Sequence, residues 1–181
     1  MTSDDKDGDF WVFGYGSLMW RPGFPFLDSR RARITGLHRS LCVFSWFHRG
    51  TQERPGLVLG LDRGGACLGL AFRVSGRERE GVIEYLRERE QVTNVYLERW
   101  HSIRFPDGSR DTALAYVVDR RHPQYAGKLH PDEQIALIER AAGQSGANPD
   151  YVTTTVQRLG ELGIHDRGLF RISQRLAAAG K

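Results

Sequence analysis

Strand-like segments fill the first two thirds of this 181-residue chain, and helix-like segments fill the last third. Short apolar runs rich in Val, Leu and Phe recur as far as position 118, with turn residues between them. From Pro131 onward the apolar residues recur at helical spacing instead. Strands and helices segregated in this way predict an α+β fold, in which the strands form a mixed sheet that can close and the late helices pack outside it.

The pattern sets the expected elements along the chain. It predicts strands over 10–15, 31–45, 58–61, 67–74, 96–104 and 112–118. It predicts helices over 77–91, 131–143, 150–162 and 166–178. The turn-forming strings DRGG at 62–65 and PDG at 106–108 each separate two of these strands, so we expect two hairpins.

The length of the chain suits one domain, which we expect over residues 10–181 after a disordered leader at 1–9. No run of eighteen apolar residues is present, so no membrane-spanning helix is expected. The first nine residues are polar and acidic rather than basic and then apolar, unlike a signal peptide. We therefore expect a cytoplasmic protein that is not associated with a membrane.

Cysteine and histidine usage gives no metal-site pattern. Cys42 and Cys67 lie in apolar runs without a CxxC partner, which favours buried free thiols. None of the six histidines forms an HxxxH or HExxH pair, and no zinc-finger spacing occurs. We expect no metal.

The formal net charge of the chain is +4, but the residues after the first nine are more basic than this value indicates. Four aspartates against one lysine give the first nine residues −3, which leaves +7 for the rest of the chain. The arginines are scattered through the chain, which suits an anionic ligand as well as it suits nucleic acid. Nucleic-acid-binding proteins normally show a clustered basic face, and no basic block stands out here. We therefore expect a small-molecule ligand and no nucleic-acid partner.

The string FGYGSLMW from Phe13 breaks the first strand into a glycine-containing loop. Gly14 and Gly16 can adopt positive φ, which lets successive amide groups converge on an anion, and Ser17 adds a hydroxyl donor. The alternative is an ordinary tight turn after an edge strand. Met19 replaces the third glycine of a GxGxxG fingerprint, and no Gly-Lys-Ser/Thr follows, so neither a dinucleotide nor a Walker loop is indicated.

One carboxylate falls on the apolar stripe of the 77–91 helix. A rotation of about 100° per residue puts Glu90 between Ile83 and Leu86, whereas Glu84 and Glu88 point toward solvent. Burial raises the pKa of a carboxyl, and the negative end of the helix dipole raises it further. Such a group can act as a general acid/base. The alternative is a structural ion pair, for which the candidate partners are Arg39, Arg49 and Arg87.

Three strings resemble the ChaC branch of the γ-glutamylcyclotransferases, the glutathione-specific enzymes. They are WVFGYGSLMW from Trp11, YLREREQVTNVY from Tyr85, and HPQYAGKLHPDEQIALIERAAGQSG from His122. With HRG at 48–50 and PGLVLGL at 55–61, the resemblance extends from Phe10 to about Ile172. It implies a γ-glutamylcyclotransferase-like mixed β-barrel with surrounding helices. It also implies conversion of glutathione into 5-oxoproline and cysteinylglycine, without a cofactor.

The resemblance also implies site residues. The catalytic glutamate of its Tyr-Leu-x-x-Arg-Glu string falls on Glu90, which the helical stripe also selects. The backbone cradle of the family falls on Tyr15, Gly16, Ser17 and Leu18. Residues that bind substrate or brace loops are expected at Arg39, His48, Arg49 and Tyr116, with the two arginines as carboxylate partners. The 91–95 segment is longer than the Gly-Gly turn of animal members and resembles bacterial and plant forms, so we expect a different pocket edge.

In the implied reaction, the α-amino nitrogen of the substrate attacks its own γ-carbonyl, and Glu90 moves the protons. Two alternatives stay open. One is a cyclotransferase for other γ-glutamyl amino acids or amines. The other is a non-catalytic regulatory module that binds γ-glutamyl groups. The intact loop and the buried acid argue against this second alternative.

Overall fold

The computed structural model of the protein describes residues 8–179, which form two compact units. Unit 1 comprises residues 8–38 and Arg63–Val117, and unit 2 comprises Arg39–Asp62 and residues 118–179. Seven of the nine residues of the predicted leader lie outside the described residues. A single domain over 10–181 stays a prediction.

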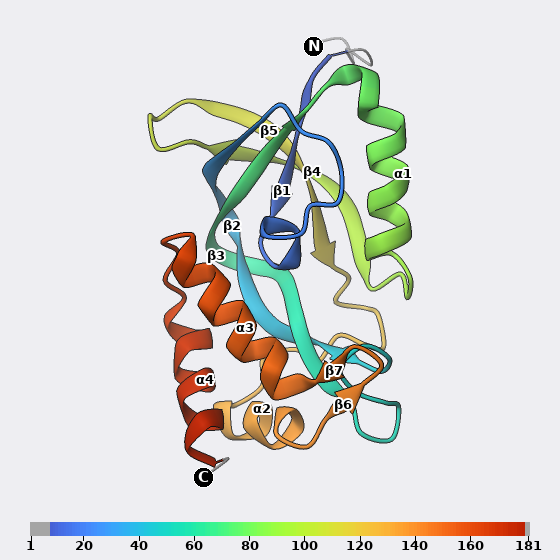
Figure 1. Ribbon diagram of the computed structural model, residues 1–181, viewed down its shortest axis with the longest axis vertical. Helices are drawn as coiled ribbons and strands as arrows, with labels where there is room; N and C mark the ends of the chain where they lie inside the picture. The colour runs from blue at the N-terminus through green and yellow to red at the C-terminus, as the bar shows by residue number, and fades with distance from the viewer. Residues whose placement is uncertain (1–7, 180–181) are drawn as a thin grey trace. The chain divides into compact units, whose positions relative to one another are not determined.

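The strands form a closed barrel in the order β1-β3-β2-β4-β5 (Figure 1). In unit 1, β1 (Phe10–Gly14) runs antiparallel to β3 (Gly56–Val74), with Phe10 opposite Val74. β1 is parallel to β5 (Arg110–Val118), which makes the sheet mixed. β2 (Asp28–Ser45) pairs antiparallel with β4 (Tyr96–Arg104). The predicted α+β fold with a mixed barrel is confirmed.

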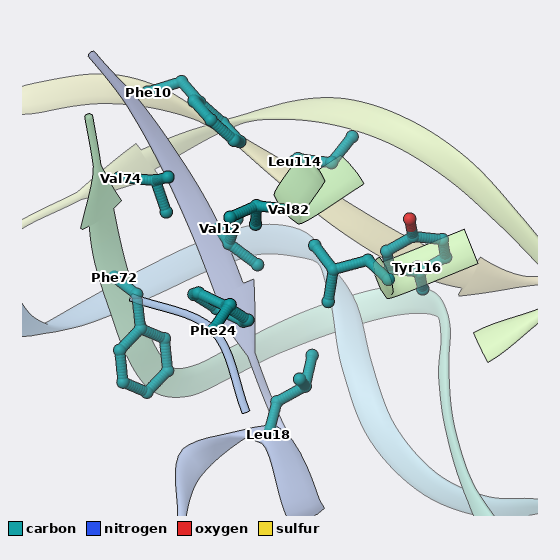
Figure 2. Packing of buried hydrophobic residues seen from close by; sticks show 10 residues of the cluster. Phe10, Val12, Leu18, Phe24, Phe72, Val74, Val82, Leu114 and Tyr116 are labelled. Atoms are coloured by element: carbon teal, nitrogen blue, oxygen red, sulfur yellow. The ribbon is translucent and has the colours of Figure 1, made fainter. Parts of the chain in front are cut away.

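Helix α1 (Arg79–Glu90) packs on unit 1 through one apolar stripe. Val82 and Leu86 are buried in a cluster with Val12 of β1 and Leu114 of β5 (Figure 2). The helix follows the short 3₁₀ turn η2 (Gly76–Glu78), which the hydroxyl of Ser75 caps by accepting a hydrogen bond from a backbone N–H. Because the stripe fixes the rotation of α1, it also fixes which side chains of the last turn face inward.

The loop between β1 and β2 is anchored on the same cluster. Its 3₁₀ turn η1 (Ser17–Met19) contributes Leu18, and the following segment contributes Phe24. Figure 2 shows Leu18 and Phe24 beside Val12, with the hydroxyl oxygen of Tyr116 at the edge of the cluster. Two buried side chains therefore hold the loop against the barrel at both of its ends.

Unit 2 contains the remaining helices, α2 (Pro131–Ile138), α3 (Asn148–Glu161) and α4 (Arg167–Ala179). Two short strands, β6 (Ala142–Gly143) and β7 (Gly146–Ala147), form a small antiparallel pair. Asn148 is fully buried, and its side chain bonds both the backbone N–H and the carbonyl of Leu57, at 2.7 and 2.8 Å. Within residues 8–179, every helix is too short or too polar to cross a membrane.

Two sequence predictions about elements are wrong. The segment 56–74 is one continuous strand, β3, rather than a hairpin. Gly64 and Gly65 do have positive φ, +102° and +64°, but the strand continues through them and the chain does not reverse. Helix α2 ends at Ile138 rather than near position 143, and the β6–β7 pair follows it.

Replacement of Gly23 should destabilise the protein more than replacement of Gly36. Both glycines have positive φ, +74° and +88°, so an alanine at either position costs on the order of 1 kcal/mol in backbone strain. A Cβ at Gly23 would also overlap the Tyr85 hydroxyl, whereas nothing lies within 4 Å of one at Gly36. We expect Gly23→Ala to lower the free energy of unfolding by at least about 1 kcal/mol more than Gly36→Ala. Urea titrations of both variants measure this, and equal losses would disprove the close approach of Tyr85.

Candidate active site

The candidate site lies in unit 1, where the loop after β1 meets the last turn of α1. Arg89 Nη2 donates a hydrogen bond to Ser17 Oγ at 2.9 Å, across 72 positions of sequence. Leu18 and Leu86 belong to one buried cluster, so the two segments are also joined by packing. The structure thus brings the predicted cradle and the predicted acid, Glu90, to the guanidinium of one arginine.

The turn after β1 presents backbone donors. Among residues 8–179, the N–H groups of Gly16, Ser17 and Leu18 find no hydrogen-bond acceptor, whereas the next amide, of Met19, donates back to the Gly16 carbonyl. The side chain of Ser17 is exposed. Unpaired N–H groups at the start of a helical turn favour an anion. Such a donor set suits a carboxylate or an oxyanion.

The glycines of this turn do not act by positive φ, contrary to the prediction. Gly16 has φ −137°, and Gly14 is not among the glycines with positive φ. A Cβ at Gly14 would lie 3.2 Å from the Cβ of Leu18 and 3.3 Å from the backbone nitrogen of Met19. Gly14 is therefore required because η1 packs closely against the end of β1, a tertiary contact that the tetrapeptide pattern does not reveal.

Glu90 is the last residue of α1, and its side chain is only 17% exposed. The Nε of Arg89 lies 3.3 Å from its Oε1. Burial raises the pKa of Glu90, and the positive charge of Arg89 offsets this only in part. The Arg89 guanidinium also donates to another acceptor, Ser17 Oγ. As helical spacing predicts, Glu90 faces inward, while Glu84 and Glu88 are exposed.

A second acid, Glu98 of β4, orients Tyr116. The Tyr116 hydroxyl donates to Glu98 Oε2 at 3.1 Å, and Arg87 donates twice to the same carboxylate at 2.8 Å. These hydrogen bonds from Arg87 hold the pKa of Glu98 below its usual value. Burial raises the pKa of Tyr116, and the negative charges of Glu98 and Glu90 raise it further. Tyr116 is therefore a neutral hydrogen-bonding group near Glu90, and Arg87 is not the ion-pair partner of Glu90.

The other three predicted residues lie in unit 2, each with partners of its own. The side chain of Arg39 is 4% exposed and lies 3.5 Å from the Asp166 carboxylate. The Nδ1 of His48 is 2.9 Å from Ser145 Oγ. Arg49 Nη1 donates to the Ala147 carbonyl at 3.3 Å, and the guanidinium lies 5.4 Å from the centre of the Tyr151 ring. These contacts brace loops of unit 2, and a role in substrate binding stays a prediction.

Sequence reasoning missed two contributors to the site, Arg89 and Glu98. A signal for Arg89 was available, since Tyr85 and Arg89 are four residues apart on α1 and share a face. The Tyr85 hydroxyl does accept a hydrogen bond from Arg89 at 3.2 Å. A signal for Glu98 was available too, since Glu98 and Tyr116 lie eighteen residues apart on the two strands of the hairpin predicted around 106–108.

The stability of the protein should depend on pH through Glu90. Because its pKa is raised in the folded state, the folded protein binds this proton more tightly than the unfolded chain does. The carboxylate therefore lowers stability as pH rises from its ordinary pKa of 4.5 toward the raised value. Glu90→Gln removes this penalty, so we expect the free energy of unfolding of the variant, relative to wild type, to increase across that window and then level off.

Urea unfolding between about pH 4 and pH 8 measures the difference. The matched control is Glu88→Gln, since Glu88 is exposed on the same helix. Its stability relative to wild type should stay flat through the window. If the two variants give parallel curves, the carboxyl of Glu90 is not desolvated.

Similarity to known proteins shows which family the chain belongs to. The family model described as ChaC-like protein matches residues 10–179. A protein of Escherichia coli (strain K12) named glutathione-specific gamma-glutamylcyclotransferase is 36% identical over 163 residues, which cover 90% of this chain and 71% of that protein. The human glutathione-specific gamma-glutamylcyclotransferase 1 is 38% identical over 156 residues, covering 81% and 69%.

A solved structure shows the same fold. It is the crystal structure of a yeast gamma-glutamyl cyclotransferase specific to glutathione, and it matches with a TM-score of 0.85. The match covers 94% of this chain and 96% of the yeast chain, at 21% sequence identity. With the closed mixed barrel, the donor turn after β1 and the buried glutamate that ends α1, these matches show that the chain belongs to the ChaC-like family.

Proposed function

We propose that the protein cleaves glutathione by cyclising its γ-glutamyl group, which yields 5-oxoproline and cysteinylglycine. The observation that carries this proposal is the position of Glu90, a largely buried acid that shares one guanidinium with Ser17 of the donor turn. The names of the relatives support glutathione as the substrate, since those from Escherichia coli and human are both glutathione-specific cyclotransferases.

The donor turn holds the negative charge at the γ-glutamyl end of the substrate. Its three unpaired N–H groups and the Ser17 hydroxyl are preorganised, because Leu18 is buried in the apolar cluster between α1 and the strands. Donors fixed in advance need no reorganisation during the reaction, so they stabilise charge in the transition state well. Holding amine and carbonyl together supplies much of the rate, since oriented intramolecular reactions reach effective molarities of about 10⁵ M or more.

The α-amino nitrogen of the substrate attacks the γ-carbonyl carbon. A new C–N bond closes the five-membered ring, and the bond from that carbon to the cysteine nitrogen breaks. Glu90 accepts a proton from the attacking nitrogen and delivers it to the leaving nitrogen, which departs as the amine of cysteinylglycine. A raised pKa suits both halves of this transfer, since the group must accept and donate near neutrality. Neither water nor a protein nucleophile is consumed.

The remaining predicted residues have supporting roles in this proposal. Tyr116 offers a neutral hydroxyl oxygen near Glu90, and its proton is engaged by Glu98. Arg39, His48 and Arg49 shape unit 2 through the partners they already have. We also propose a cytoplasmic location, because Cys42 and Cys67 are buried free thiols, which suits a reducing compartment.

Glu90→Gln should abolish turnover without unfolding the protein. Loss of a general acid/base typically costs about 10²–10⁴-fold in rate, so we expect the rate of 5-oxoproline release from glutathione to fall by at least about 10²-fold. Chromatography of both products measures the rate, and circular dichroism checks the fold. Glu88→Gln, an exposed site two residues earlier, should keep the wild-type rate. Comparable turnover by Glu90→Gln would remove this residue from the mechanism.

Glutathione should be a better substrate than γ-glutamyl-alanine. The two compounds share the γ-glutamyl group that cyclises, so the leaving portion alone distinguishes them. We expect kcat/KM for glutathione to exceed that for γ-glutamyl-alanine by at least about tenfold, equal to about 1.4 kcal/mol of transition-state binding. Assays of both substrates with wild-type protein decide this. Equal values would indicate a general γ-glutamylcyclotransferase.

A further inference from the structure

The guanidinium of Arg89 ties the loop after β1 to helix α1. Its Nη2 donates to Ser17 Oγ at 2.9 Å. Its Nη1 donates to two backbone carbonyls of the same loop, those of Arg21 and of Pro22, the latter at 3.4 Å. One side chain thus contacts the loop at its donor turn and again four to five residues later.

The same guanidinium is held from the helix side. Its Nη1 also donates to the Tyr85 hydroxyl at 3.2 Å, one helical turn earlier, and its Nε lies 3.3 Å from Glu90 Oε1. The Tyr85 hydroxyl is in turn placed against Gly23, where any Cβ would overlap it. Arg89 and Tyr85 therefore hold the segment between Ser17 and Gly23 at both ends.

This arrangement also sets the direction of the Ser17 proton. A hydroxyl has one proton to donate and two lone pairs that accept. Arg89 has no acceptor, so in their hydrogen bond the Ser17 oxygen must accept. The Ser17 proton is then free for another partner, and the exposed hydroxyl joins the unpaired amides of Gly16, Ser17 and Leu18 as a donor.

We propose that Arg89 is a positioning residue of the cyclotransferase reaction, one that fixes the donor turn at a set distance from Glu90 and holds the Ser17 hydroxyl in place with its proton available to donate. The inference rests on the proposed function. An arginine is required because its planar fork presents five N–H groups in fixed directions, whereas a lysine presents three on one flexible nitrogen. All three nitrogens of this fork are engaged: Nη2 by a hydroxyl, Nη1 by two carbonyls and a phenol that share its two N–H groups, and Nε by the Glu90 carboxylate.

The first test is Arg89→Lys, which keeps the charge and removes the fork. A displacement of about 1 Å between reacting groups can cost about 10²-fold, so we expect kcat/KM for glutathione to fall by at least about tenfold, with a loss in kcat. The control is Arg77→Lys, since Arg77 is exposed in the turn η2 that precedes α1. Thermal unfolding of both variants shows whether a loss of activity merely follows a loss of folded protein.

The second test is a double-mutant cycle with Ser17→Ala. If Arg89 acts through the Ser17 hydroxyl, Arg89→Lys should reduce kcat/KM less in the Ser17→Ala background than in wild type. A residue that only stabilises the fold would give independent losses. The two losses would then multiply.

The third test uses the pH profile. Arg89→Gln removes the positive charge beside Glu90, so the acidic limb of kcat/KM should move to higher pH than in Arg89→Lys. An unmoved limb would show that the guanidinium does not lie beside Glu90 in the active enzyme, and would overturn the proposed placement of the two groups. If the glutamine variant fails to fold, the lysine variant and the cycle still decide the question.

The outcomes separate the two proposals. If wild-type protein releases no 5-oxoproline from glutathione, the proposed function fails. Two results with an active wild type would overturn the positioning role of Arg89 and leave the proposed function standing. One is a kcat/KM of Arg89→Lys equal to that of Arg77→Lys. The other is a double variant in which the losses of kcat/KM from Arg89→Lys and Ser17→Ala multiply.

Discussion

The site depends on the packing of one turn of α1 against the strands of unit 1. Val82 and Leu86 pack in a cluster that also contains Leu18 of the donor turn and Tyr116 of β5. This one apolar contact sets the rotation of the helix, and with it the direction in which Arg89 and Glu90 point. Glu90 faces inward because it continues the same stripe by one turn.

The electrostatics of the site balance two opposing effects on one carboxylate. Burial disfavours the charge of Glu90, and Arg89 favours it. Because the guanidinium also serves carbonyl and hydroxyl acceptors, its positive charge is not committed to Glu90 alone. Glu98 shows the opposite result, since a bidentate Arg87 stabilises its charge despite partial burial. Two acids close to one tyrosine thus keep different proton affinities, which is how a single site can hold both a proton carrier and a fixed anion.

Periodicity predicted the elements that depend on local pattern. Helix α1 and strand β4 lie where the sequence places them, and Glu90 was selected by rotation about the helix axis alone. The failures concern contacts that the helix and strand periods do not describe. The turn-like string at 62–65 stays inside β3 because strand pairing outweighs the preference of two glycines for a turn. Gly14 matters through the close approach of Leu18, four residues later, and Glu98 through its hydrogen bond to Tyr116 on the neighbouring strand β5. Hydrophobic periodicity describes neither contact.

The parallel pairing of β1 with β5 has a consequence for how the site forms. Trp11 lies opposite Ala113, so the barrel closes only by joining segments about a hundred residues apart. Contacts between such distant positions form late, because loop-closure entropy must be overcome first. The donor turn begins directly after β1, and Tyr116 lies on β5. A nascent chain whose β5 has not yet emerged from the ribosome would therefore lack both the closed barrel and Tyr116. The complete site can assemble only when the barrel closes.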